Sequence, residues 1–232
     1  MGRHRRYFPV PRGLVPCLYS YHLAGGVQTM KKNETDLHPF LIRIWHWSNA
    51  LIIFVLIITG ADLRFTDVDI FSDYGFTVNL HKYAGYLLAV SFLFWIAAYQ
   101  ILGGFARHYV LSFKDMRSIP AQTTYYIHGH FRGGANPFKA SPSSRFNALQ
   151  KLAYSFIMFI AMPLIIATGI VFGNIMDFYA LISATGGIRV LDIIHVIVGY
   201  IFVLYLIVHL YMATLGKHVF SHTKAMITGR EE

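Results

Sequence analysis

Four histidines lie in four separate apolar stretches of the sequence, and their positions divide them into two pairs. His46 and His209 each lie six residues from one end of a stretch, whereas His81 and His195 lie toward the opposite ends of theirs. Ionisable side chains inside a bilayer are costly, so histidines placed there indicate a function. Imidazole is an axial ligand of heme iron. The pairs therefore predict two hemes, one held by His46 and His209, the other by His81 and His195.

The apolar stretches themselves predict membrane-spanning helices. Hydrophobic residues make up 55% of the chain and charged residues only 13%. Because a helix of roughly 20 residues crosses the ~30 Å hydrocarbon core, stretches of this length span it. They cover about 40–60, 81–105, 149–172 and 189–215. The predicted fold class is an all-α membrane protein, a four-transmembrane-helix bundle that encloses two hemes.

The fourth stretch supplies one ligand to each heme. His195 and His209 are fourteen residues apart, which in a helix is about 21 Å along the axis and about 40° in azimuth. One face of this helix thus presents two imidazoles at two depths. His108, the main competitor, is about 40 Å of helix beyond His81 and half a turn out of phase, so we expect it to lie outside the hydrocarbon.

Each candidate ligand is followed four residues later, on the same helical face, by a small residue. These residues are Ala50, Gly85, Gly199 and Ala213. A flat macrocycle against a helix needs a small neighbouring turn, although close packing of membrane helices also selects small residues. Structural or proton-relay roles for the four histidines remain the alternative to heme ligation.

Cations lie near the helix entrances at both heme levels. Arg43, Lys82 and Arg189 could each pair with a heme propionate. Each could equally extend its charged end to the membrane interface.

Basic residues predict the orientation of the chain. Six Lys and Arg precede the first stretch, six lie in the 104–147 connection and three follow the last stretch, whereas the 61–80 and 174–188 connections hold only Arg64. Basic loops stay in the cytoplasm, so both termini and the long loop 106–147 are predicted to be cytoplasmic. The net charge of +9 reflects this topology, and we expect no nucleic-acid partner.

The N-terminal segment 1–37 differs from the rest of the chain, 38–232, which forms the predicted heme domain. It is basic and interrupted by prolines, which predicts a disordered tail or a start assigned too early. It also holds Cys17, the single cysteine. One thiol allows neither covalent heme attachment nor a cysteine-ligated iron–sulfur cluster, so the hemes are expected to be b-type and any cluster to belong to a partner.

Several segments together resemble a known family. They are 38–47 (HPFLIRIWHW) with Thr59-Gly60, 81–85 (HKYAG), 145–151 (RFNALQK), His195, 209–211 (HLY) and 225–229 (AMITG). Over about residues 38–230 the chain is similar to the diheme cytochrome b subunits of membrane-bound formate dehydrogenases, with related subunits in thiosulfate reductases and nickel–iron hydrogenases. The resemblance implies a cytoplasmic heme on His46 and His209 and a periplasmic heme on His81 and His195, the same pairing that depth predicts.

The function implied by the resemblance is electron transfer across the bacterial inner membrane. A periplasmic iron–sulfur or cytochrome subunit, with its catalytic subunit, would exchange electrons with a quinone, menaquinone or ubiquinone, at the cytoplasmic side. Apart from these, we expect only membrane lipid as a partner.

A quinone site is predicted at the start of the third stretch. Asn147 and Gln150 are three residues apart, hence on one helical face, at the level of His46 and His209. Their amides could hydrogen-bond a quinone carbonyl, and the resemblance supports Asn147 in particular. The alternative is that Asn147 only caps the helix.

Two other functional classes remain as alternatives. A histidine-lined transporter would need a polar site at the membrane midplane, whereas the ionisable residues of this chain lie toward the two interfaces and leave the centre apolar. A heme-free membrane anchor would make the four histidines incidental.

Overall fold

The computed structural model describes residues 39–65, 67, 70–102, 109–138, 146–216 and 218–229. Within these residues the regular structure is entirely helical. The segment 1–37 with Cys17 lies outside the described residues, as do His38 and His108.

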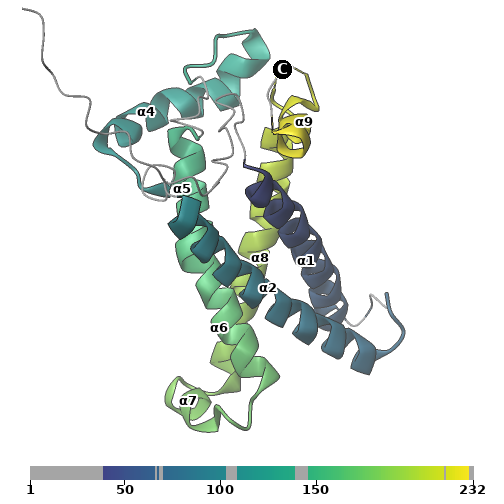
Figure 1. Ribbon diagram of the computed structural model, residues 1–232. Coiled ribbons are helices and arrows are strands. Elements are labelled where there is room, and N and C mark those ends of the chain that lie inside the picture. The colour runs from purple at the N-terminus through teal and green to yellow at the C-terminus, as the bar shows by residue number, and fades with distance from the viewer. Residues whose placement is uncertain are drawn as a thin grey trace, which may run out of the picture. The chain divides into compact units, whose positions relative to one another are not determined.

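Four helical segments are long and apolar enough to cross a membrane, which confirms the four predicted spans. They are α1 (Phe40–Arg64), α2 (Tyr74–Leu102), the continuous run of α5 (Ala148–Phe156), η3 (Ile157–Ala161) and α6 (Met162–Gly173), and α8 (Ile188–Ala213) (Figure 1).

The second span begins earlier than predicted. Helix α2 starts at Tyr74, because Asp73 Oδ1 accepts a hydrogen bond from the backbone N–H of Phe76 at 3.1 Å and so caps the helix. The prediction followed hydropathy alone and was wrong on this boundary. His81 consequently lies two turns inside α2 instead of at its first residue.

The third span accommodates a proline within its length. Pro163 has no N–H and cannot donate to the carbonyl of the preceding turn. The chain forms the π-helical turn η3 directly before it, and the N–H of Met162 bonds to the carbonyl of Ile157. Such a single widened turn lets a helix continue past a local defect, so the span remains continuous.

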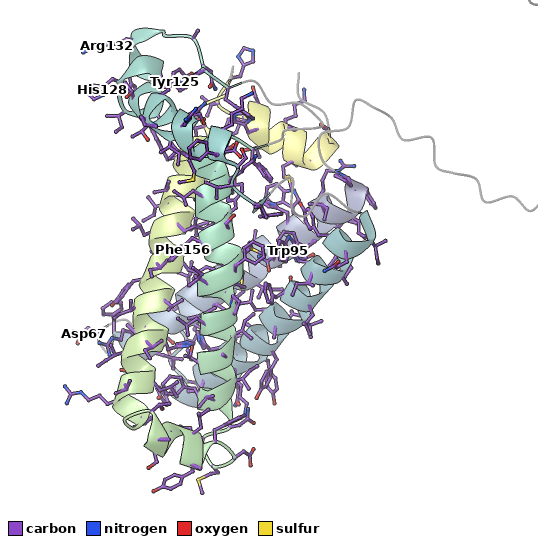
Figure 2. All side chains as sticks on the ribbon, turned by 90° about the vertical axis from the view of Figure 1, so that its left-hand side faces the viewer. Asp67, Trp95, Tyr125, His128, Arg132 and Phe156 are labelled. Atoms are coloured by element: carbon purple, nitrogen blue, oxygen red, sulfur yellow. The ribbon has the colours of Figure 1, made fainter. Side chains whose placement is uncertain are left out.

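The spans pack in sequence, α1 along α2, α2 against α6 and α6 against α8. Trp95 on α2 is fully buried and is labelled among the spans in Figure 2. Its ring stacks on Phe92 at a centroid distance of 5.9 Å and meets Tyr109 edge-on at 5.2 Å. Aromatic packing of this kind holds α2 in the core.

Polar bonds fix α1 against α2. Trp45 Nε1 donates to the carbonyl of Ser91 at 2.9 Å, and Ser91 Oγ donates to Asn49 Oδ1 at 3.0 Å. Hydrogen bonds between membrane helices specify their relative positions. These bonds therefore set the depth of His46 on α1 relative to that of His81 on α2.

Short helices cover the two ends of the spans. Helices α4 (Phe113–Thr124) and α9 (Ser221–Thr228) lie at one end, and α7 (Tyr179–Ala184) lies at the other (Figure 1). The π turn η1 (Tyr125–Gly129) and the 3-10 turn η2 (His130–Arg132) follow α4. The long loop of the sequence prediction thus contains regular helix.

Candidate functional site

The first predicted histidine pair is brought together by α1 and α8. His46 lies one turn and a half into α1, and His209 lies near the end of α8. Their ring centroids are 6.1 Å apart with an interplanar angle of 48°. Tyr205, one turn before His209, stacks on the His209 ring at 5.7 Å, which restricts the orientation of that imidazole.

The second pair joins α2 and the other end of α8. The ring centroids of His81 and His195 are 6.3 Å apart with an interplanar angle of 71°. Phe172 at the end of α6 meets the His195 ring edge-on at 5.5 Å. All four imidazoles are half-buried between helices.

The distances within the pairs suit a metal placed between two imidazoles. A metal–imidazole nitrogen bond is about 2 Å long, and the ring centre lies roughly 1 Å farther out, so two rings on opposite sides of one metal have centres about 6 Å apart. Within the described residues, no group of three His, Cys, Asp or Glu could hold a metal ion. Two protein ligands per site suit heme iron, because the macrocycle supplies the remaining ligands.

Two of the predicted small residues leave room beside the ligands. A Cβ added at Gly85 or Gly199 would have no heavy atom within 4 Å. The helix surface one turn from His81 and one turn from His195 is therefore open to a flat group. The residues present fit the predicted hemes, although their role as ligands stays a prediction.

The sequence alone assigned no role to two threonines that contact the second pair, although Thr59-Gly60 is among the segments that carry the family resemblance. Thr59 Oγ1 on α1 lies 2.8 Å from Nδ1 of His81, and Thr168 Oγ1 on α6 lies 2.8 Å from Nδ1 of His195. Both threonines are buried. Each precedes a glycine within a span, and this repeated Thr-Gly dipeptide is the signal that could have identified them.

The three predicted cations differ in their surroundings. Lys82 Nζ donates to the carbonyl of Gly173 at 2.9 Å, where a positive charge suits the C-terminus of α6. Arg189 is exposed at the start of α8. Arg43 Nη1 donates to the carbonyl of Ile227 on α9, while its Nε is buried without a hydrogen-bond partner among the described residues.

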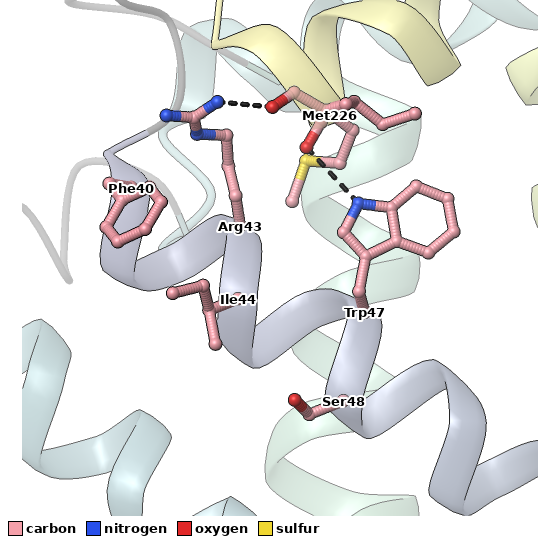
Figure 3. Close-up of a pocket in the computed structure, with 7 residues that line it drawn as sticks. Phe40, Arg43, Ile44, Trp47, Ser48 and Met226 are labelled. Atoms are coloured by element: carbon pink, nitrogen blue, oxygen red, sulfur yellow. Dashed lines mark hydrogen bonds between the residues drawn. The ribbon is translucent and has the colours of Figure 1, made fainter.

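Arg43 also lines an open surface pocket of about 470 Å³ between α1 and α9 (Figure 3). Phe40, Ile44 and Met226 form part of its apolar wall. The indole N–H of Trp47 donates to the carbonyl of Met226 at 3.3 Å. These contacts tie the C-terminal helix to the first turns of the first span.

The two predicted quinone-site amides form a helix cap. Asn147 Oδ1 accepts from the backbone N–H of Gln150 at 2.9 Å, and Gln150 Oε1 accepts from the backbone N–H of Asn147 at 3.0 Å. Asn147 Nδ2 also donates to the hydroxyl of Tyr126 at 2.9 Å. Asn147 therefore does cap this helix, and a quinone role for the two amides stays a prediction.

Two further histidines, His128 and His130 in the 104–147 connection, lie apart from both pairs. Figure 2 shows Tyr125, His128 and Arg132 together beyond the end of the spans. His130 Nδ1 lies 3.3 Å from the hydroxyl of Tyr125, within the same segment. The structure does not bring either loop histidine to the paired imidazoles.

Comparison with known proteins identifies the family. The profile of the family described as prokaryotic cytochrome b561 matches residues 37–229. The chain belongs to the prokaryotic cytochrome b561 family. Four spans and this membership make it a multi-pass protein of the bacterial inner membrane that binds b-type heme and transfers electrons.

A named relative of this cytochrome b561 comes from Escherichia coli (strain K12). The protein named "Putative cytochrome YdhU" is 30% identical over 224 residues, which cover 93% of this chain and 83% of that protein. The predicted cytochrome b family is thereby confirmed. These matches identify the family, and membership of a formate dehydrogenase-like complex stays a prediction.

Proposed function

We propose that this cytochrome b561 holds two b-type hemes and passes electrons across the membrane between a periplasmic partner and a quinone at the cytoplasmic side. The observation that carries the proposal is the approach of the histidines in two pairs, whose ring centroids are 6.1 and 6.3 Å apart. The two α8 members of these pairs, His195 and His209, are fourteen residues apart, which is about 21 Å along the helix. Two redox sites at two depths suit transfer across a membrane.

The residues of the chain hold and isolate these sites. His46 with His209 would hold the inner heme, and His81 with His195 the outer heme. A bound heme iron supplies one-electron transfer. The spans around the sites are apolar, which keeps water away, and burial is one of the properties by which a protein sets heme potential.

The proposed orientation follows from charge. The basic residues concentrate in the N-terminal tail, the 104–147 connection and the C-terminal tail, so these segments are cytoplasmic. The His81–His195 pair then faces the periplasm and the His46–His209 pair the cytoplasm. A charge moved across the membrane is worth about 2.3 kcal/mol per 100 mV, so transfer in this direction stores energy.

The partners that we propose are those of a formate dehydrogenase-like complex. An iron–sulfur or cytochrome subunit in the periplasm, with its catalytic subunit, would exchange electrons with the outer pair. The single cysteine, Cys17, supports a cluster in the partner instead of in this chain.

The quinone site is proposed at the start of α5. The capping box uses the carbonyl oxygen of Gln150 and leaves its NH₂ group to donate to a quinone carbonyl. Asn147 is buried and bonded to Tyr126, so its part is to hold this helix start in place beside the ligand.

Replacement of single histidines tests the ligand assignment. The purified full-length protein should show two b-type hemes in its reduced-minus-oxidised spectrum. Each of His81→Ala and His195→Ala should remove the same spectral component, and each of His46→Ala and His209→Ala should remove the other. The exposed His128 provides the control, and His128→Ala should retain both components. Loss of one component by both His46→Ala and His81→Ala would contradict the pairing, and absence of heme would refute the proposal.

Gln150 tests the quinone site separately from the cap. Gln150→Glu keeps a carbonyl-type acceptor for the N–H of Asn147 but removes the NH₂ group. We expect normal heme content and normal reduction by the partner, with quinone turnover lowered several-fold. Asn147→Ala should lower both turnover and stability. Parental turnover in Gln150→Glu and in Gln150→Ala at equal heme content would place the quinone elsewhere.

A further inference from the structure

Each imidazole of the His81–His195 pair is contacted by a threonine from another membrane span. Thr59 on α1 reaches Nδ1 of His81, and Thr168 on α6 reaches Nδ1 of His195, both at 2.8 Å. The two contacts involve different pairs of helices, α1 with α2 and α6 with α8. The same geometry is therefore built twice around one site.

The hydrogen-bond donors in this arrangement can be assigned. A threonine hydroxyl has one hydrogen to donate. Thr59 Oγ1 lies 2.8 Å from the carbonyl oxygen of Val55, and Thr168 Oγ1 lies 2.8 Å from that of Leu164. A carbonyl can only accept, so each hydroxyl donates to the carbonyl of its own helix and accepts from the imidazole.

The imidazoles are consequently held in one tautomer. Nδ1 of His81 and of His195 carries the proton, and Nε2 keeps its lone pair for a metal. The glycine after each threonine leaves the imidazole accessible, because a Cβ at Gly60 or Gly169 would be 3.4 or 3.5 Å from the Cε1 atom of the ring. Nothing larger than hydrogen projects from the helix at that point.

We propose that Thr59 and Thr168 are positioning residues that orient the outer ligands and lower the reduction potential of the heme they hold. The proposal rests on the proposed ligand role of His81 and His195. A hydrogen bond from the second ring nitrogen raises the basicity of a metal-bound imidazole. A more basic ligand stabilises the oxidised iron, so the potential falls.

The inner pair differs in this respect. Nδ1 of His46 is buried and has no hydrogen-bond partner among the described residues. The ligand of the inner heme on α1 thus lacks the contact that both outer ligands have. This difference contributes to a lower potential at the outer heme than at the inner heme, and that contribution favours electron movement from the periplasmic to the cytoplasmic heme.

Potentiometric titration of the purified protein tests this role. Thr59→Val and Thr168→Val keep the side-chain shape and remove the hydroxyl. Each variant should keep two hemes bound and raise the midpoint potential of the outer heme alone. At a fixed ambient potential, the ratio of reduced to oxidised outer heme should increase by up to about tenfold, and a tenfold change equals 59 mV for a one-electron couple. Thr59→Ser and Thr168→Ser retain the hydroxyl and should keep the parental potential.

The matched control is Thr185, whose hydroxyl bonds to the carbonyls of Leu181 and Ile182 in the same way but contacts no imidazole. Thr185→Val should leave both potentials unchanged. Parental potentials in both valine variants at full heme content would overturn the proposal, as would an equal shift of the inner component. Failure of the ligand assignment is seen separately, because His81→Ala and His195→Ala would then retain the outer component.

Discussion

At the scale of single residues, a lysine inside the third span has an unexpected structural role. Lys151 Nζ lies 2.9 Å from Asp115 Oδ2, and their side chains are only 10% and 20% exposed. Asp115 also accepts hydrogen bonds from the backbone and hydroxyl of Ser112. The carboxylate thus caps α4 and joins it to α5, which holds the short helix beside the spans.

Stability should therefore depend on the ionisation of Asp115. Partial burial acts to raise the pKa of Asp115, but hydrogen bonds from Ser112 and Lys151 outweigh it and hold that pKa below its usual value. A lowered pKa contributes stability above the unfolded-state pKa of about 4 and loses it as pH falls through the folded-state pKa. The unfolding temperature of the parent should fall more steeply below pH 4 than that of Asp115→Asn.

The exposed Asp177 supplies the control for this measurement. Asp177→Asn should show the same acid dependence as the parent. Parallel curves for the parent and Asp115→Asn would show that the ion pair contributes nothing to stability.

At the scale of helices, side-chain caps set the start of two of the four spans, α2 and α5. Asp73 starts α2 well before the most apolar residues of the stretch, and Asn147 with Gln150 starts α5. Both are local signals of side-chain type and spacing. Hydropathy alone located the third span within a residue of its true start but placed the second too late.

Removal of the second cap should weaken α5 measurably. Asn147→Ala deprives the N–H of Gln150 of its acceptor and should cost about 1–2 kcal/mol in the free energy of unfolding. Asn147→Ser restores an acceptor and should recover most of that loss. The measurement is thermal unfolding in detergent, with heme content determined beforehand. Equal unfolding temperatures for Asn147→Ala and the parent would contradict a stabilising cap.

At the scale of the whole molecule, the last helix lies against the first span. Arg43 and Trp47 on α1 bond to backbone carbonyls of α9. The C-terminal segment therefore lies on the same side of the membrane as the start of α1, as an even number of spans requires. Charge then decides which side that is.

Reporter fusions should define the membrane orientation. Fusions after Asp67 and after Thr185 should be active only as periplasmic reporters, whereas fusions after Arg132 and after the final residue should be active only as cytoplasmic reporters. The reason is that the latter connections carry most of the Lys and Arg. A cytoplasmic signal after Asp67 would reverse the orientation and with it the heme that faces the periplasmic partner.

The sequence by itself was enough to determine the four spans and the family, and to predict which histidines pair. Span length, hydropathy and helical periodicity are local properties, and they sufficed to predict that His46 would meet His209 and that His81 would meet His195. The structure brings these pairs together at 6.1 and 6.3 Å, while heme ligation itself stays a prediction.

Only the tertiary structure decided which side chains support those histidines. The contact of Thr59 with His81, that of Thr168 with His195 and the Lys151–Asp115 pair join residues 22, 27 and 36 positions apart. Such partners depend on how neighbouring helices cross and rotate, which packing of many side chains sets together. Hydropathy and periodicity fix the depth of each residue and the face of the helix on which it lies. They do not fix which side chain of the neighbouring helix contacts that residue.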